Sequence, residues 1–240
     1  MTVKPYNTGK SKKEEVRAMF DGIAPRYDLL NHTLSASIDR LWRRRVVRIV
    51  GRCRPGRILD VATGTGDLAI ELARRIPEAE VLAVDLSEGM LAVARRKVAQ
   101  RGLSGRIDLE QGDAEHLFLA DASVDAATVA FGVRNFGDLD RGLAELARTI
   151  KPGGKVVILE FSRPRNRVLR ALYEFYTFRV LPRIGGLLSR DRRAYEYLPA
   201  SVEEFPAPEE FLRIMTRAGF ANCRARSLSC GIAQIYIGER

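Results

Sequence analysis

Three acidic residues stand in or directly after short apolar runs of the chain, where carboxylates can bind a polar ligand. Asp60 lies within the first run, Asp85 ends the second, and Asp113 follows the third. If these runs are parallel strands, their carboxyl ends meet at one edge of a sheet. At such an edge Asp85 can accept hydrogen bonds from ribose hydroxyls, and Asp113 from an adenine amino group. The spacing therefore predicts a site for an adenosine ligand.

A glycine turn between the first two runs is compatible with two ligands. Gly64-x-Gly66-x-x-Ala69 fits the loose dinucleotide fingerprint, and Asp85 follows at about the 20-residue interval that places an acid on the ribose. NAD is therefore one alternative. Asp67 favours another, because a carboxylate at the start of a helix occupies the free N–H groups and repels phosphate. S-adenosylmethionine carries a sulfonium and no phosphate, so it fits better; a turn that only caps a helix is the third interpretation.

The segments around this turn predict an α/β fold. Arg57–Leu86 has the pattern strand, glycine turn, helix, strand, and a crossover of this length joins parallel strands. We therefore predict a doubly wound, Rossmann-like sheet, mostly parallel, with an antiparallel C-terminal strand pair. The expected strands are Ile58–Ala62, Val81–Val84, Ile107–Glu110, Val124–Phe131, Lys155–Glu160, Cys223–Leu228 and Ile232–Gly238.

The flanking segments complete a single domain of residues 1–240. A short helix, Glu14–Phe20, is expected to end at Gly22 and Pro25, and an amphipathic helix is expected over Ser35–Val50. The expected parts are an N-terminal helical cap (1–50), a cofactor-binding core (51–162), a substrate lid (163–200) and a C-terminal helix with a hairpin (201–240). Aromatic residues are concentrated in the lid segment. A stripe of this kind usually belongs to the core, and a wall for an apolar substrate is the alternative.

The bulk composition narrows the cellular setting. The chain has 240 residues, a net charge of +10 and three cysteines without metal-binding spacing, which indicates a reduced cytosolic protein without structural disulfides. No apolar run approaches the roughly 20 residues of a membrane span, and the polar N-terminus has no secretory signal. The positive charge indicates an anionic partner, either nucleic acid or an acidic membrane surface.

Four segments carry a family pattern. They are Tyr27-Asp28-x-x-Asn31 with Leu34, Ser35 and Trp42, LDVATGTGD at Leu59–Asp67, FGVRN at Phe131–Asn135, and RTIKPGGKVVILEFS at Arg148–Ser162. Together they resemble the UbiE/MenG family of ubiquinone and menaquinone biosynthesis C-methyltransferases. The glycine turn is common to class I methyltransferases, whereas the other segments are much more specific to this family. The resemblance runs from Met19 to the C-terminus.

This resemblance implies a class I methyltransferase that uses S-adenosylmethionine to methylate a ring carbon of a polyprenyl quinol. The quinol would be demethylmenaquinol, or the 2-methoxy-6-polyprenyl-1,4-benzoquinol of ubiquinone synthesis. The implied cofactor contacts are Thr63, Asp85, Asp113 and Ala114, to which the glycine turn and the end of the second strand add Gly64, Gly66 and Leu86. The chain departs from the family pattern where Leu30 stands for a methionine, Asp39 for a histidine and Ala130 for a serine that contacts the cofactor.

Methylation of a quinol carbon requires donors for the oxyanion that develops when a neighbouring hydroxyl loses its proton. Arg134 and Asn135 follow the fourth strand, so they lie at the same sheet edge as the cofactor and are the expected catalytic residues. Proton removal is assigned to water or to a carboxylate, Asp28 or Asp67. His116 is a weaker candidate, because a lone loop histidine is more often a surface residue. The methyl donor is already activated, so no metal is expected.

The tail of such a quinol lies in a membrane, and the basic segments of the chain could bind the surface of that membrane. Arg43–Arg48 or Arg170–Arg183 would rest on anionic lipid, so the expected location is cytoplasmic and peripheral at the inner face of the membrane. No nucleic-acid partner is expected, since no RNP motif is present. Methylation of another small molecule or of RNA, and an NAD-dependent oxidoreductase, are the alternatives. The oligomeric state is open, with a homodimer among the options.

Overall fold

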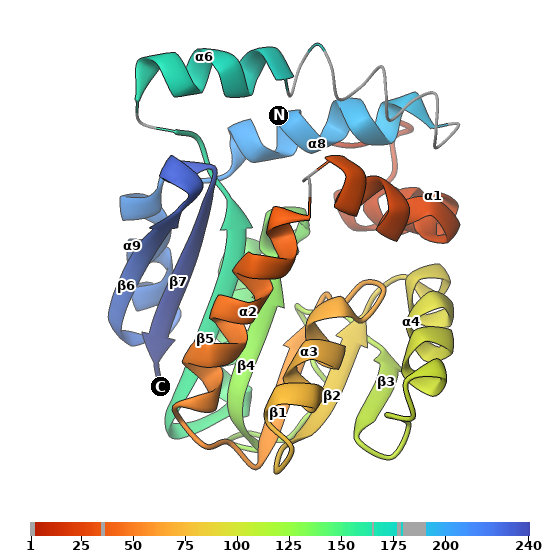
Figure 1. Cartoon of the computed structure of the whole chain (residues 1–240). Helices are drawn as coiled ribbons and strands as arrows, with labels where there is room; N and C mark the ends of the chain where they lie inside the picture. The colour runs from red at the N-terminus through yellow and green to blue at the C-terminus, as the bar shows by residue number, and fades with distance from the viewer. Residues whose placement is uncertain (1–2, 35–36, 165, 177–178, 180–190) are drawn as a thin grey trace.

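A mixed sheet forms the centre of the computed structural model, which describes residues 3–34, 37–164, 166–176, 179 and 191–240 (Figure 1). Within these residues the sheet has seven strands in the order β3-β2-β1-β4-β5-β7-β6. Their bounds are β1 Arg57–Val61, β2 Glu80–Asp85, β3 Ile107–Gln111, β4 Val124–Ala130, β5 Ile150–Phe161, β6 Ala221–Leu228 and β7 Ala233–Glu239. Strands β1 to β5 are parallel, and β7 runs antiparallel to both neighbours. The predicted fold class is confirmed.

Continuous apolar runs form the central strands. Ile58 and Leu59 of β1 and the run Val156–Leu159 of β5 are fully buried. Such runs are needed where helices cover both faces of a parallel sheet. Strand β5 begins at Ile150, earlier than the predicted Lys155, because the turn before the apolar run still pairs with β4 through an irregular register. The predicted strands are therefore correct in order and differ from the structure mainly at their ends.

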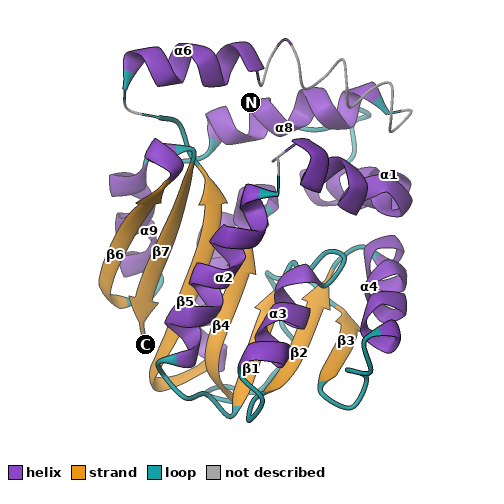
Figure 2. Cartoon of the chain, in the orientation of Figure 1, coloured by secondary structure: helices purple, strands orange, loops and turns teal. Residues whose placement is uncertain are grey.

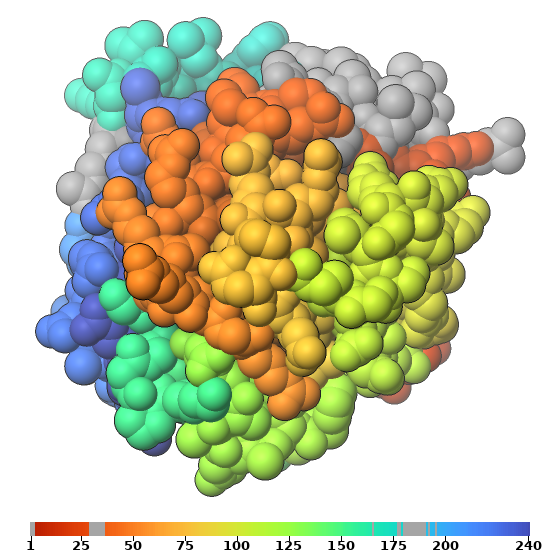
Figure 3. All heavy atoms as spheres, turned by 60° about the horizontal axis from the view of Figure 1, so that its bottom comes forward, coloured from red at the N-terminus to blue at the C-terminus, as the bar shows by residue number. Residues whose placement is uncertain are grey.

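Helices cover both faces of the sheet (Figure 2). On one face α2 (Ile38–Gly51), α3 (Asp67–Arg75) and α4 (Glu88–Gln100) lie side by side (Figure 3). On the other face lie α5 (Leu139–Thr149) and α9 (Pro208–Arg217). The strand order reverses between β1 and β4. In sheets of this kind, the carboxyl ends of the strands at the reversal point form the ligand crevice.

The first helix departs from the prediction. Helix α1 spans Lys12–Leu34, although Gly22 and Pro25 lie inside it. Proline lacks an N–H and therefore removes one hydrogen bond from a helix. The buried stripe that offsets this loss packs on α4 and α8 and comprises Val16, Met19, Ile23 and Ala24. The prediction that Gly22 and Pro25 end the helix is wrong, and α1 continues above the carboxyl edge of the sheet (Figure 1).

Two further helices, α6 (Arg167–Phe175) and α8 (Arg192–Glu204), lie above the same edge (Figure 1). Both belong to the segment whose aromatic stripe predicted a core position. No residue of α6 is buried, and the side chains of Leu172 and Phe175 are 61% and 62% exposed. Helix α8 instead buries Tyr197. The core interpretation is therefore wrong for the part of the stripe that lies in α6, and Tyr197 lies outside that stripe. The described part of the chain does not include Phe178, Val180, Leu181 or the side chain of Leu30. The division of the domain into a cap, a core and a lid stays a prediction.

Candidate active site

A cavity lies at the carboxyl ends of β1, β2 and β4, where the strand order reverses. The predicted site residues that line it are Thr63, Gly64, Asp85, Leu86, Asp113, Ala114 and Asn135. Gly66 and Arg134 were predicted for the same site but do not line the cavity. Seven of the nine predicted site residues therefore line one cavity, and their roles stay a prediction.

The two glycines of the turn have different roles. Gly64 has φ +59°, and an added Cβ there would meet nothing within 4 Å, so the backbone of the turn faces open space. Gly66 has φ +79°, and its Cβ would lie 3.2 Å from the Cβ of Ala94 in α4. Both positions have the left-handed conformation that favours glycine. Gly64 thus opens the backbone to a ligand, whereas Gly66 turns the chain into α3 against α4.

Asp85 joins the loops that follow β1 and β2. One carboxylate oxygen accepts the backbone N–H of Gly64 at 2.7 Å, and the other accepts that of Ser87 at 2.8 Å. Burial raises the pKa of Asp85 to about 6, although these two N–H groups act in the opposite direction. The carboxylate is fixed in place and still borders the cavity, so its remaining lone pairs can accept hydrogen bonds from ligand hydroxyls.

Asp60 supports the turn through hydrogen bonds with two threonines. Its carboxylate accepts the hydroxyls of Thr63 at 2.7 Å and Thr128 at 2.6 Å. Burial raises the pKa of Asp60 to about 6, and the two threonine hydroxyls lower it in part. Because the Thr63 hydroxyl donates its proton to Asp60, its oxygen faces a ligand as an acceptor.

Asp113 is paired with a lysine of α1. The Nζ of Lys13 lies 2.6 Å from Asp113 and 2.8 Å from Glu115. Burial alone would raise the pKa of Asp113, but the hydrogen bonds from Lys13 and from the Glu115 N–H bring it below its ordinary value. Asp113 is therefore ionised at neutral pH and holds the start of α1 against the loop that follows β3.

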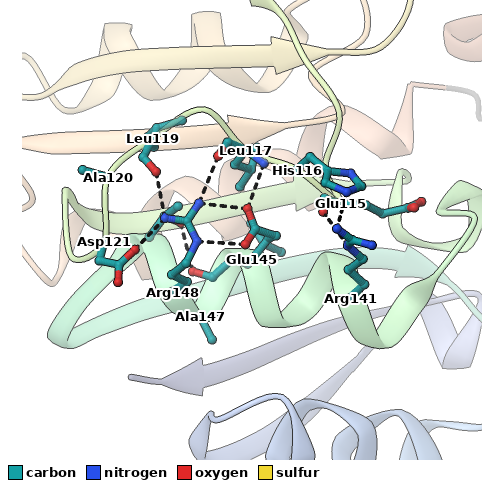
Figure 4. A network of polar contacts seen from close by, with 12 residues as sticks. Glu115, His116, Leu117, Leu119, Ala120, Asp121, Arg141, Glu145, Ala147 and Arg148 are labelled. Carbon is teal, nitrogen blue, oxygen red and sulfur yellow. Dashed lines mark hydrogen bonds and ion pairs between the residues drawn. The ribbon is translucent and has the colours of Figure 1, made fainter.

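That loop is also held from α5 (Figure 4). Arg148 donates to the carbonyls of Leu117 and Leu119 and pairs with Asp121, while Glu145 accepts the N–H of Leu117 at 2.9 Å. Figure 4 also shows His116 beside Arg141, and Nδ1 of His116 lies 3.5 Å from the carboxylate of Asp113. The network fixes the path of the chain that carries Asp113 and Ala114 to the cavity. His116 does not line the cavity.

Basic side chains surround Asp67, which the sequence analysis did not predict. Lys97 of α4 places its Nζ 2.6 Å from Asp67 and 2.5 Å from Asp28, and Arg43 lies 3.8 Å from Asp67. These cations offset part of the negative charge with which Asp67 was expected to repel phosphate. Counted over its lining residues, the cavity still has five carboxylates and three basic side chains, so its net charge favours a cationic ligand over a dinucleotide.

The ends of β1 and β4 approach each other unusually closely. An added Cβ on Gly132 would lie 2.5 Å from the Cβ of Ala62 and 3.0 Å from Val129, distances at which atoms clash. Ala62 and Phe131 themselves have φ +53° and +60°, a conformation that is strained for residues with a side chain. Strain of this kind persists where the surroundings enforce it, and here it turns both strand ends around the cavity.

Arg134 departs from its expected role. Its side chain is buried, and the guanidinium donates to Glu160 and to the carbonyl of Phe131, both at 2.6 Å. Burial raises the pKa of Glu160, while Arg134 stabilises its charged form. Arg134 does not line the cavity, so the prediction that it donates directly to the substrate is not supported by its placement. Its contacts fix the turn that carries Asn135, which does line the cavity.

Helix α1 supplies one wall of the cavity, which the sequence analysis missed. Its lining residues include Val16, Arg17, Phe20 and Tyr27. Val16, Arg17 and Phe20 lie within the predicted helix Glu14–Phe20, but its apolar spacing did not indicate that it covers the cavity. Tyr27 lies beyond Gly22 and Pro25, where the helix was expected to end. Among the positions that depart from the family pattern, Asp39 is buried in an ion pair with Arg43, and Ala130 lines the cavity.

The described part of the chain offers neither a metal cluster nor a membrane-spanning helix. No group of three or more His, Cys, Asp or Glu side chains in this part of the chain could hold a metal ion. No helix in the same residues is both long and apolar enough to cross a membrane.

Comparisons with known proteins agree with this geometry. Residues 8–240 match the model of the ubiE/COQ5 methyltransferase family. The chain is 50% identical over 230 residues to the ubiquinone/menaquinone biosynthesis C-methyltransferase UbiE of Geobacter sulfurreducens, covering 95% of this chain and 90% of that protein. It is 45% identical over 238 residues to the demethylmenaquinone methyltransferase of Bacteroides fragilis, covering 99% and 97%.

The fold is also found among solved structures. A putative S-adenosyl-L-methionine-dependent methyltransferase from Methanococcus maripaludis superposes with a TM-score of 0.64 at 22% identity, covering 90% of this chain and 91% of that one. Similarity at this level of identity supports the class I methyltransferase fold.

The pH dependence of ligand binding tests the role of Asp85. Only the ionised carboxylate accepts ligand hydroxyls on both oxygens, so affinity for S-adenosylhomocysteine is expected to be full above the pKa of about 6 and to fall as the pH drops below it. Calorimetry across this range measures the effect. Asp85→Asn should weaken binding by ~1.5–3 kcal/mol at neutral pH and flatten the profile. A wild-type affinity that does not change with pH would contradict this role, and a dependence that persists in Asp85→Asn would belong to Asp60.

Gly132→Ala tests the close approach of β1 and β4. Because its Cβ would overlap the Cβ of Ala62, the substitution should lower the free energy of unfolding by ~1–3 kcal/mol. Urea denaturation measures this change. Gly105→Ala is the matched control, since an added Cβ there meets nothing within 4 Å. Equal stability of the two variants would show that the strand ends separate without cost.

Proposed function

Because the chain belongs to the ubiE/COQ5 methyltransferase family, we propose that its cavity binds S-adenosylmethionine against a polyprenyl quinol, most specifically demethylmenaquinol. The enzyme is an S-adenosylmethionine-dependent C-methyltransferase of quinone biosynthesis. The 2-methoxy-6-polyprenyl-1,4-benzoquinol of ubiquinone synthesis is proposed as a second substrate, since relatives of similar identity are named for either pathway. The family leaves the RNA methyltransferase and NAD-dependent oxidoreductase alternatives without support.

The residues that line the cavity suit the cofactor in charge. We assign Asp85 to the ribose hydroxyls, Asp113 and Ala114 to the adenine, and the open backbone at Gly64 to the amino-acid part. Five lining carboxylates suit a ligand with a sulfonium and an ammonium group. When bound, S-adenosylmethionine supplies a methyl group that is already activated on sulfur. The observation that carries this assignment is the fixed, cavity-lining carboxylate of Asp85.

The protein activates the quinol and orients it. Loss of a hydroxyl proton makes the neighbouring ring carbon nucleophilic, because the phenolate oxygen donates charge into the ring. The carbon must be held in line with the methyl group at roughly 3–3.5 Å. Once this carbon has gained the methyl group, its ring hydrogen must leave as a proton to restore the aromatic quinol. Asn135 lines the cavity and is proposed as the donor that stabilises the oxygen anion. Arg134 is proposed to hold Asn135 in place. Of the two carboxylates predicted to take the proton, Asp28 and Asp67, only Asp67 lines the cavity, so Asp67 is proposed to take the proton through water.

The redox state of the substrate tests this mechanism. The reduced quinol has the hydroxyl that the reaction requires, so purified enzyme should methylate demethylmenaquinol and leave demethylmenaquinone unchanged. Mass spectrometry of the extracted quinones measures both. Methylation of the oxidised quinone at an equal rate would refute the phenolate step.

The variant Asn135→Ala should have a kcat about 10²-fold lower, as expected for loss of an oxyanion donor, and should bind S-adenosylhomocysteine with normal affinity.

Membrane contact is proposed for α6. Its apolar stripe is unburied, with Leu172 and Phe175 among its exposed members, and Arg163 and Arg167 are exposed beside it. Apolar and basic groups together suit the surface of an anionic membrane, where the polyprenyl tail of the substrate resides. We therefore propose a cytoplasmic enzyme that associates peripherally with the inner face of the membrane. A homodimer stays a prediction.

Vesicle sedimentation tests the contact through α6. The wild-type protein should pellet with vesicles that contain anionic lipid more than with neutral vesicles, and the double variant Leu172→Glu/Phe175→Glu should remain in the supernatant. Phe118→Glu is the matched control, because Phe118 is 59% exposed on the loop after β3. Equal pelleting of the wild type with both vesicles, or none with either, would remove the membrane proposal.

A further inference from the structure

We propose that helix α8 sets the orientation of the catalytic amide, and that Tyr197 is the positioning residue through which it does so. This inference rests on the proposed function, because it assigns a task to Asn135 in the methyl transfer. It adds a residue that neither the sequence patterns nor the family resemblance indicated. The supporting observations are a hydrogen bond, the placement of a second contact one helical turn away, and the way in which α8 is tied to the rest of the chain.

In the structure a hydrogen bond joins the oxygen end of the Asn135 amide to α8. The hydroxyl of Tyr197 donates to Oδ1 of Asn135 at 3.1 Å. Within the part of the chain that the structure describes, Nδ2 of Asn135 has no hydrogen-bond partner, and Asn135 lines the cavity. An amide held by its oxygen presents its N–H groups to a ligand. Rotation of the amide would instead bring a carbonyl oxygen against the phenolate, where like charges repel.

A second contact from the same face of α8 holds the preceding residue. Ser201 lies four residues after Tyr197, so both side chains project from one face of the helix. Its hydroxyl accepts a hydrogen bond from Nε of Arg134 at 3.3 Å and donates to the carbonyl of Leu198 at 2.8 Å. Two side chains of α8 therefore contact two consecutive residues of the short helix Val133–Asn135.

Tyr197 is suited to donate and unsuited to act as a base. Its side chain is 5% exposed and packs with Met90 and the apolar stripe of α1. Burial raises the pKa of Tyr197 to about 12, so the hydroxyl keeps its proton over the whole range in which the enzyme works. The hydroxyl can therefore hold Oδ1 of Asn135 at any such pH, and a change of pH should not release it.

Helix α8 is itself anchored near both ends by the N-terminal segment. Near its first residue, Asp191 accepts the hydroxyl of Tyr6 at 2.5 Å. In its last turn, Glu204 accepts the backbone N–H of Val3 at 3.0 Å. The segment in turn wraps around Glu15, whose carboxylate accepts three backbone N–H groups of residues 6–8. The helix that orients Asn135 is thus fixed to α1, the opposite wall of the cavity.

Tyr197→Phe removes only the hydroxyl and is the direct test. The amide of Asn135 then loses its fixed orientation, so kcat for demethylmenaquinol should fall about tenfold, while the Kd for S-adenosylhomocysteine stays within about twofold of wild type. Tyr236→Phe is the matched control. The Tyr236 hydroxyl is buried, and among the described residues it has no hydrogen-bond partner, so its loss should leave kcat unchanged.

A double-mutant cycle separates positioning from a general structural effect. If Tyr197 acts through Asn135, Tyr197→Phe should cause no further loss of kcat in an Asn135→Ala background. Additive losses would overturn the proposal. Thermal unfolding shows whether each variant is folded at the assay temperature. Ser201→Ala is a second probe of the same helix face and should lower kcat about twofold, a smaller effect because Arg134 keeps its bonds to Glu160 and Phe131.

The outcomes distinguish this inference from the proposed function. If the wild-type enzyme binds S-adenosylhomocysteine but methylates neither quinol, the substrate assignment fails and the kcat comparison is made with the substrate that is then found. If the wild type methylates the quinol and Tyr197→Phe and Ser201→Ala both keep its kcat, the substrate assignment stands and the positioning role of α8 is wrong.

Discussion

The carboxylate of Asp85 makes the interaction on which the rest of the site depends. By accepting one N–H from the glycine turn and one from the start of α4, it ties the loops after two neighbouring strands into a single surface. The two N–H groups offset the cost of burying a charge that is otherwise unfavourable in a protein interior. Asp60, Gly66 and the strained end of β4 hold the neighbouring backbone around this point, and the ligand surface follows from their arrangement.

The acids at the sheet edge serve the protein as well as the ligand. Lys13 satisfies Asp113 and Glu115, and Lys97 satisfies Asp67 and Asp28. Both lysines connect α1 to the loops of the sheet, Lys13 from α1 itself and Lys97 through Asp28. A carboxylate at the end of a strand is therefore not a binding residue by its position alone. Asp85 differs from these four because its hydrogen-bond partners are backbone N–H groups, and within the described residues it forms no ion pair.

The sheet could be predicted from the sequence because its strands are buried on both faces and appear as unbroken apolar runs. The connection rules for parallel strands then place Thr63, Asp85 and Asp113 at one edge without further information. The direction of a side chain at that edge could not be predicted in the same way. Arg134 and Asn135 are adjacent in sequence, yet one faces the interior and the other the cavity, because Glu160 and α8 provide partners from distant parts of the chain. The end of helix α1 was predicted too early because the local helix breakers Gly22 and Pro25 were weighed without the tertiary packing that offsets them.

The contacts of the N-terminal segment span most of the polypeptide. Lys13 meets a residue 100 positions later, Lys12 bonds the carbonyl of Arg134, 122 positions later, and Val3 meets Glu204 across 201 positions. The part of the chain that leaves the ribosome first must therefore wait for almost all of the remainder before it can dock. Contacts so distant in sequence raise the contact order and slow folding, so the wall that α1 supplies to the cavity depends on residues from almost the whole described chain.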